Sequence, residues 1–176
     1  MMSHSMFIIV RLVHIVVAVL WVGAVVFIAR FLLPTMKAVG PAAGPIMTHL
    51  TQVRKLPAYL MSGAVITVLS GVTLFWYDSV GFSSDQWMHS PPGLAFSVGG
   101  TIGIIVALIG MVVNAPAARQ LGALGAAVRA SGGPASAAQE AEMARLQGRL
   151  AGSMKVTAIL LVIAAVAMAV ARYLPF

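Results

Sequence analysis

Four long apolar stretches, separated by polar or basic connections, dominate the pattern of this chain. Their uncharged cores are Leu12–Ala29, Leu56–Tyr77, Gly93–Val113 and Val156–Ala171. A membrane-spanning helix needs about 20 mainly apolar residues. With their flanking turns, the stretches predict spans over about residues 7–33, 56–77, 93–113 and 152–172. The pattern therefore predicts an all-α integral membrane protein built as an antiparallel, up-down four-helix bundle.

The composition agrees with a membrane protein. Of the 176 residues, 60% are hydrophobic and 9% are charged, whereas an ordinary soluble domain has about 25% charged residues. The spans leave no room for a separate catalytic domain, so we expect one transmembrane domain over residues 1–176. The chain has no cysteine, which excludes disulfides, thiolate metal sites and iron–sulfur clusters.

The basic residues are distributed unevenly between the two sides of the predicted bundle. Two connections hold nine of them: Arg30, Lys37, Arg54, Lys55, Arg119, Arg129, Arg145, Arg149 and Lys155. The opposite side holds Arg11 and Arg172. By the positive-inside rule the two basic connections are cytoplasmic, and both termini are extracytoplasmic. The formal charge of +7 therefore indicates membrane topology rather than nucleic-acid binding.

The connection between the third and fourth spans has the pattern of a helical hairpin. The stretch Ala115–Met154 is rich in alanine and is interrupted by Ser131-Gly132-Gly133-Pro134. After this break, Ser136 and Gln139 have the spacing of a capping box. We expect a cytoplasmic helical hairpin between helices 3 and 4, with an unstructured loop as the alternative.

The first span carries the most informative polar residues. Positions i, i+3, i+7 and i+10 share one helix face, and this face holds Arg11, His14, Ala18 and Trp21. An ionisable residue inside a span is costly and usually has a partner in the protein interior. His14 therefore requires an explanation, and three interpretations remain open.

In the first interpretation His14 is an axial ligand of haem b. Its neutral imidazole binds iron, Arg11 pairs with a haem propionate, and Ala18 leaves space for the macrocycle. In the second, His14 is structural and bonds a neighbouring Ser or Thr, while Arg11 only anchors the helix. In the third, His14 binds copper together with His4 and the methionines of Met1-Met2-Ser3-His4-Ser5-Met6, because imidazole and thioether suit copper(I).

Three stretches of the chain resemble one family of membrane proteins. They are Arg11-Leu12-Val13-His14-Ile15 with Ala18, Trp21 and Gly23; Arg54-Lys55-Leu56-Pro57; and Val112-Val113-Asn114-Ala115-Pro116-Ala117-Ala118-Arg119. They look like the copper-resistance-D-like membrane proteins and the related HemJ-type protoporphyrinogen oxidases. The resemblance implies the bacterial cytoplasmic membrane and b-haem binding at His14. A lysine that is also important in HemJ-type proteins has no match in this chain.

A six-coordinate haem needs a second ligand in the outer half of the membrane. The candidates are His89, in an extracytoplasmic loop, and Met168, in the outer part of the fourth span. Arg172 ends that span at the level of Arg11, so both cations face the plane of haem propionates or of lipid phosphates.

These residues favour a membrane haem b protein that transfers electrons or oxidises a lipophilic substrate, without identifying a catalytic residue. One alternative is a copper-handling permease, and another is a non-catalytic subunit of a larger membrane complex. The expected partners are the lipid bilayer and a membrane redox protein or complex. Gly99 and Gly103 have the spacing of a close helix contact, which occurs either within one chain or between copies in a homo-oligomer.

Overall fold

The computed structural model describes residues 3–175, and every regular element in this range is helical. The α-helices are α1 (His4–Phe27), α2 (Leu33–Val39), α3 (Ala43–Thr48), α4 (Leu56–Asp78), α5 (Asp85–Met88), α6 (Pro91–Ile109), α7 (Ala115–Ala130) and α8 (Ala137–Ala171). The wider π-helical turns are η1 (Ile28–Leu32), η3 (His49–Val53) and η4 (Gly110–Asn114), and η2 (Gly40–Ala42) is a 3₁₀ turn. The predicted all-α class is confirmed.

Four helices are long and apolar enough to cross a membrane. They are His4–Val39, Leu56–Asp78, Pro91–Ala130 and Ala137–Ala171. The predicted spans coincide with the apolar parts of these helices, as expected for a membrane protein. The first and third helices are longer than predicted because the π-helical turns η1 and η4 widen the helix locally without ending it.

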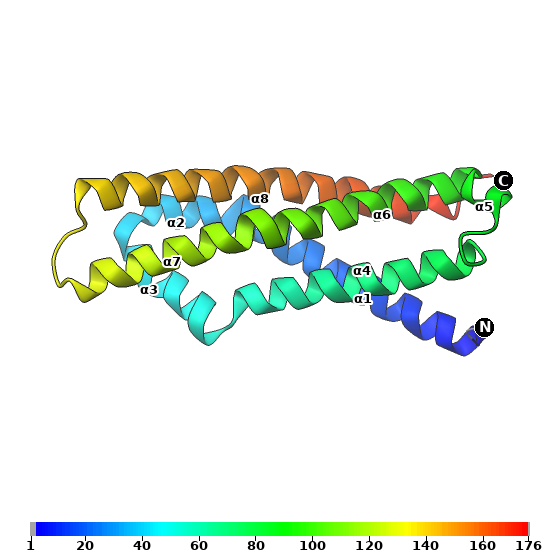
Figure 1. Ribbon diagram of the computed structural model, residues 1–176, viewed down its shortest axis with the longest axis horizontal. Helices are drawn as coiled ribbons and strands as arrows, with labels where there is room; N and C mark the ends of the chain where they lie inside the picture. Colours follow the sequence, from blue (N-terminus) through cyan, green and yellow to red (C-terminus); the bar gives the residue numbers. More distant parts are fainter. Residues whose placement is uncertain (1–2, 176) are drawn as a thin grey trace.

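The long helices lie along one axis of the molecule (Figure 1). Both termini are at one end, and the turn between α7 and α8 is at the other. Helices α6 and α7 run beside α8, and α1 crosses α4. The two packed pairs also contact each other, through α4 with α6 and through α1 with α8.

The buried apolar core occupies the middle of the molecule. Its members are Trp21, Val25, Ile28 and Ala29 near the end of α1; Ala64; Val106 and Ala107; and Met154, Ala158 and Leu161. Trp21 is 5% exposed, so its indole ring packs in this core. Gly63 makes room for this ring, because a Cβ at Gly63 would lie 3.2 Å from the Trp21 Cβ.

The predicted helical hairpin is present as α7 and α8. The Ser136 hydroxyl accepts from the Gln139 backbone, and the Gln139 side chain accepts from the Ser136 backbone, which completes the expected capping box. Leu146 of α8 is 1% exposed, and the two helices pack against each other. The break contains Gly132 at φ +67°, a backbone conformation that glycine adopts without steric cost.

The first basic connection is helical over most of its length. It contains α2, α3 and the turn η3. Lys55 has φ 54° and separates η3 from α4, and Pro57 lies in the first turn of α4, where no backbone N–H is needed. This left-handed residue turns the chain back into the direction of α4.

Candidate functional site

His14 joins α1 to α4 through one of its two ring nitrogens. Its Nδ1 lies 3.0 Å from the backbone oxygen of Thr67 and 3.1 Å from Oγ of Ser70. The ring is half-buried, and Thr67 and Ser70 are buried. The bond that the structural interpretation of His14 predicts is therefore present, and it uses only Nδ1.

The partners of Nδ1 determine which nitrogen carries the ring hydrogen. A backbone carbonyl can only accept, so His14 Nδ1 must be the donor to Thr67. The Ser70 hydroxyl donates to the Ile66 carbonyl at 2.6 Å, which leaves its lone pairs able to accept from His14. In the neutral ring with hydrogen on Nδ1, the Nε2 atom keeps a lone pair that can bind a metal.

Gly71 makes the approach of His14 to α4 possible. A Cβ at this position would lie 2.9 Å from Cε1 of His14 and 3.3 Å from Nδ1. A real Cβ would have to push the ring away from its two acceptors. Ser70 thus supplies a hydrogen-bond acceptor for the His14 ring, and Gly71 leaves the space that the ring occupies.

The contacts between helices place His14 and Met168 at a similar depth. Trp21 and Leu161 belong to the same core cluster, and His14 and Met168 each lie seven residues from these toward the termini. Seven residues are about two helical turns, or about 10.5 Å. Met168 packs over Gly99 of α6, where a Cβ would lie 2.7 Å from its Cγ. Counted outward from this cluster, the two candidate ligands therefore lie toward the same end of the bundle, on different helix pairs.

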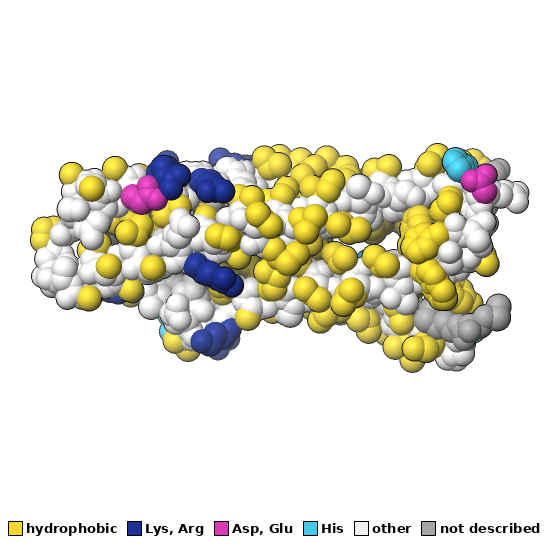
Figure 2. Space-filling view, in the orientation of Figure 1, with side chains coloured by type: hydrophobic (Ala, Val, Ile, Leu, Met, Phe, Trp, Pro, Cys, Tyr) yellow, Lys and Arg dark blue, Asp and Glu magenta, His cyan; other side chains and the backbone are white. Residues whose placement is uncertain are grey.

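Small residues occur on α1 and α6 toward the end of the molecule that carries the termini. Ala18 of α1 is half-buried, and a Cβ at Gly100 or Gly103 of α6 would meet no atom within 4 Å. Figure 2 shows an opening between α4 and α6 in the half that carries the termini. The packed apolar core does not extend to this level among the described residues.

The two arginines expected near a propionate are both at the end that carries the termini. Arg11 is half-buried, and its charge acts on the carboxylate of Asp78 at the end of α4. The two groups form none of the ion pairs found in residues 3–175. Arg172 is exposed where α8 ends. Arg11 is thus the cation held closer to the protein interior.

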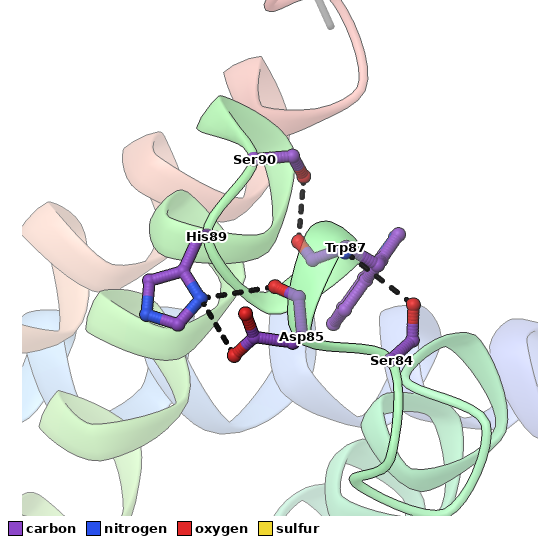
Figure 3. Close-up of polar contacts among 5 residues, drawn as sticks. All are labelled: Ser84, Asp85, Trp87, His89 and Ser90. Atoms are coloured by element: carbon purple, nitrogen blue, oxygen red, sulfur yellow. Dashed lines mark hydrogen bonds and ion pairs between the residues drawn. The ribbon is translucent and has the colours of Figure 1, made fainter.

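His89 has partners within its own loop. Its Nδ1 lies 2.9 Å from the Asp85 backbone oxygen and 3.2 Å from the Asp85 carboxylate, at the surface beyond α5 (Figure 3). Ser84 and Ser90 cap the neighbouring turns. His89 is therefore held at the rim of the molecule, which makes it a weaker candidate than Met168 for a ligand opposite His14.

The N-terminal copper motif is described only in part. Met1 and Met2 lie outside the described residues, and His4 and Met6 are exposed at the start of α1. Within residues 3–175, no three His, Asp or Glu side chains form a group that could hold a metal ion. The described part of the motif shows no arrangement that favours copper over the other interpretations.

The sequence did not identify Thr67, Ser70 and Gly71 as the residues that receive His14. The signal was present as a group of small and hydroxyl residues in the second span, but several positions offered it. No family model, curated protein or solved structure matches this chain. The assignment of the site therefore rests on the geometry of its own side chains.

A Gly71→Ala substitution tests the fit between His14 and α4. We expect it to lower stability by about 1–3 kcal/mol, because the added methyl group overpacks the ring. Gly23→Ala is the matched control, since a Cβ at Gly23 meets no atom within 4 Å and alanine is the better helix former. Thermal unfolding in detergent measures both variants, and equal midpoints would contradict the contact.

Proposed function

We propose that this chain is a membrane haem b protein that transfers electrons or oxidises a lipophilic substrate. The observation that carries the proposal is the bonding of His14, whose Nδ1 lies 3.0 Å from a carbonyl that can only accept. Metal-ligating histidines almost always donate their other nitrogen to such an acceptor, which fixes the tautomer and the ring orientation. His14 has this arrangement without any metal-binding cluster around it.

The residues of the site fit a haem group in three respects. His14 offers Nε2 from α1, and Met168 offers a thioether from the terminal part of α8. Gly100 and Gly103 add no side-chain bulk to α6, and a Cβ at either position would meet no atom within 4 Å. Arg11, half-buried one turn from His14, is placed to bind a propionate by a charge-assisted hydrogen bond.

Bound haem would supply one-electron redox chemistry, and the residues of the chain would set its conditions. Thr67 and Ser70 hold the His14 ring in one orientation, so that its basicity and direction stay fixed. The apolar core around Trp21 separates the site from the basic end of the molecule. The opening between α4 and α6 (Figure 2) offers a lipophilic substrate or a membrane redox partner a route from the bilayer.

For the membrane arrangement we propose an antiparallel, up-down bundle in a bacterial cytoplasmic membrane. The visible Lys and Arg side chains lie toward the α7–α8 end in Figure 2, and the middle of the molecule is apolar. By the positive-inside rule this end is cytoplasmic. The α7–α8 hairpin then extends into the cytoplasm, and His14 lies in the outer half of the membrane.

Single cysteines test this topology, because the chain has none of its own. Ser83 lies in the loop before α5 and Ser131 at the α7–α8 turn, and both are exposed. We expect a membrane-impermeant maleimide to label the Ser83→Cys variant in intact cells and the Ser131→Cys variant only after permeabilisation. The reverse result would contradict the proposed orientation.

An absorption spectrum tests the haem assignment directly. We expect protein purified from a haem-producing host to show a b-type spectrum that changes on reduction with dithionite. The His14→Ala variant is expected to lose most bound haem, because the iron would lose its fixed axial ligand. His49→Ala, at an exposed position in η3, is the matched control. A His14→Ala protein with the full wild-type spectrum would refute the assignment.

A further inference from the structure

Two buried oxygen atoms near the junction of α6 and α7 have no hydrogen-bond partner among the described residues. They are Oδ1 of Asn114 and Oγ1 of Thr157. Asn114 is 9% exposed and Thr157 is 3% exposed. Buried polar atoms in folded proteins nearly always have a partner, either in the protein or in ordered water. Two unpaired oxygens in one interface therefore indicate a bound group between them.

The register of the two helices brings these atoms to adjacent turns of one interface. The Asn114 amide nitrogen donates to the Met154 sulfur at 3.5 Å, so Asn114 faces Met154 across the interface with α8. The helix that contains η4 and helix α8 run in opposite directions, and Thr157 follows Met154 by three residues. Thr157 therefore faces the turn that begins at Gly110, about one helical turn, or about 5.4 Å, from Asn114.

Space is present at the same position. Gly110 lies four residues after Val106 and eleven after Gly99, so it shares the helix face that contacts α8. A Cβ at Gly110 would nevertheless meet no atom within 4 Å. The π-helical turn η4, which spans Gly110–Asn114, widens the helix at this point. Such turns in membrane helices are commonly completed by polar side chains and ordered water.

We infer that one water molecule is bound between Asn114 and Thr157, in the space beside Gly110. It donates a hydrogen bond to Asn114 Oδ1, and it exchanges a second hydrogen bond with the Thr157 hydroxyl. A bridging water spans about one helical turn between two polar atoms and needs two to four such partners. Both partners, the Asn114 amide and the Thr157 hydroxyl, are uncharged groups, which suits a water molecule.

The water joins the membrane-embedded part of the molecule to the hairpin. Asn114 directly precedes α7, and Pro116 occupies the first turn of that helix. The turn η1, on the opposite pair, also contacts α8 in this region. Holding Asn114 to α8 fixes the angle at which α6 continues into α7.

The direction in which a Thr157 substitution shifts the unfolding midpoint distinguishes a hydroxyl bound to water from an unpaired one. Valine has nearly the same shape as threonine but has no hydroxyl. If water is bound, Thr157→Val removes one of its partners, and we expect the unfolding midpoint in detergent to fall by about 2–4 °C. If the hydroxyl is unpaired, the same change removes a buried polar group and the midpoint rises. Thr73→Val is the matched control, since that hydroxyl bonds only its own helix, at Leu69.

A double-mutant cycle tests whether the two residues share the water. We expect Asn114→Leu to lower the unfolding midpoint as well. The double variant Asn114→Leu/Thr157→Val is expected to lower the midpoint by clearly less than the sum of the two single decreases. Strictly additive losses, or a midpoint that rises in Thr157→Val, would overturn the inference. Where Asn114→Leu does not fold, Thr157→Val and Thr157→Ser decide. Serine loses the methyl group but retains the hydroxyl, so its midpoint is expected to be higher than that of valine, and a higher midpoint for valine would overturn the inference.

Discussion

A backbone carbonyl has no hydrogen to donate, and this constraint determines the chemistry of His14. Because Thr67 presents such a carbonyl at 3.0 Å, the ring hydrogen lies on Nδ1 and the free lone pair lies on Nε2. The same bond fixes the crossing of α1 and α4, which Gly71 permits by having no side chain. One interaction thus sets both the helix contact and the direction of the candidate ligand.

The two halves of the molecule are organised differently around this contact. Apolar packing is concentrated between Trp21 and the basic end, where helices associate through close contact of side chains. Lipid tails are as apolar as leucine, so such packing and interhelical hydrogen bonds provide the attraction between helices in a membrane. The other half relies on His14, its hydroxyl and carbonyl partners, and small residues. Within residues 3–175, His14 forms hydrogen bonds there through Nδ1, and its Nε2 has no hydrogen-bond partner.

Much of the fold was predictable because membrane helices have strong, regular signals. Span length follows from the thickness of the hydrocarbon region, and the capping box at Ser136 follows from local spacing. The π-helical turns were not predictable, because a π-helical turn holds one extra residue and its amino-acid composition does not differ from that of the surrounding helix. The helical structure of the first connection could not be predicted from its sequence, because the Pro and Gly residues at positions 40–45 are also typical of loops.

Only the α1 residues of the candidate site were predictable from the sequence. The face of α1 indicated His14 and Arg11 by helical periodicity alone, and it indicated the depth of the ring. The partner helix carried Ser62, Ser70 and Thr67, and sequence spacing does not select among hydroxyl residues one or two turns apart. That choice depends on the crossing of α1 and α4, which the small residues Gly63 and Gly71 determine together. The pairing of Met168 with Gly99 likewise depends on how α6 and α8 are aligned.

The most direct measurement of the central claim is the protonation of the two His14 ring nitrogens. Nitrogen-15 NMR on histidine-labelled protein, with His4, His49 and His89 replaced by Gln, observes this ring alone. The account predicts hydrogen on Nδ1 and a bare Nε2, whose resonance is displaced or lost when haem is added. Hydrogen on Nε2 with a bare Nδ1, or an Nε2 resonance that haem leaves unchanged, would contradict it.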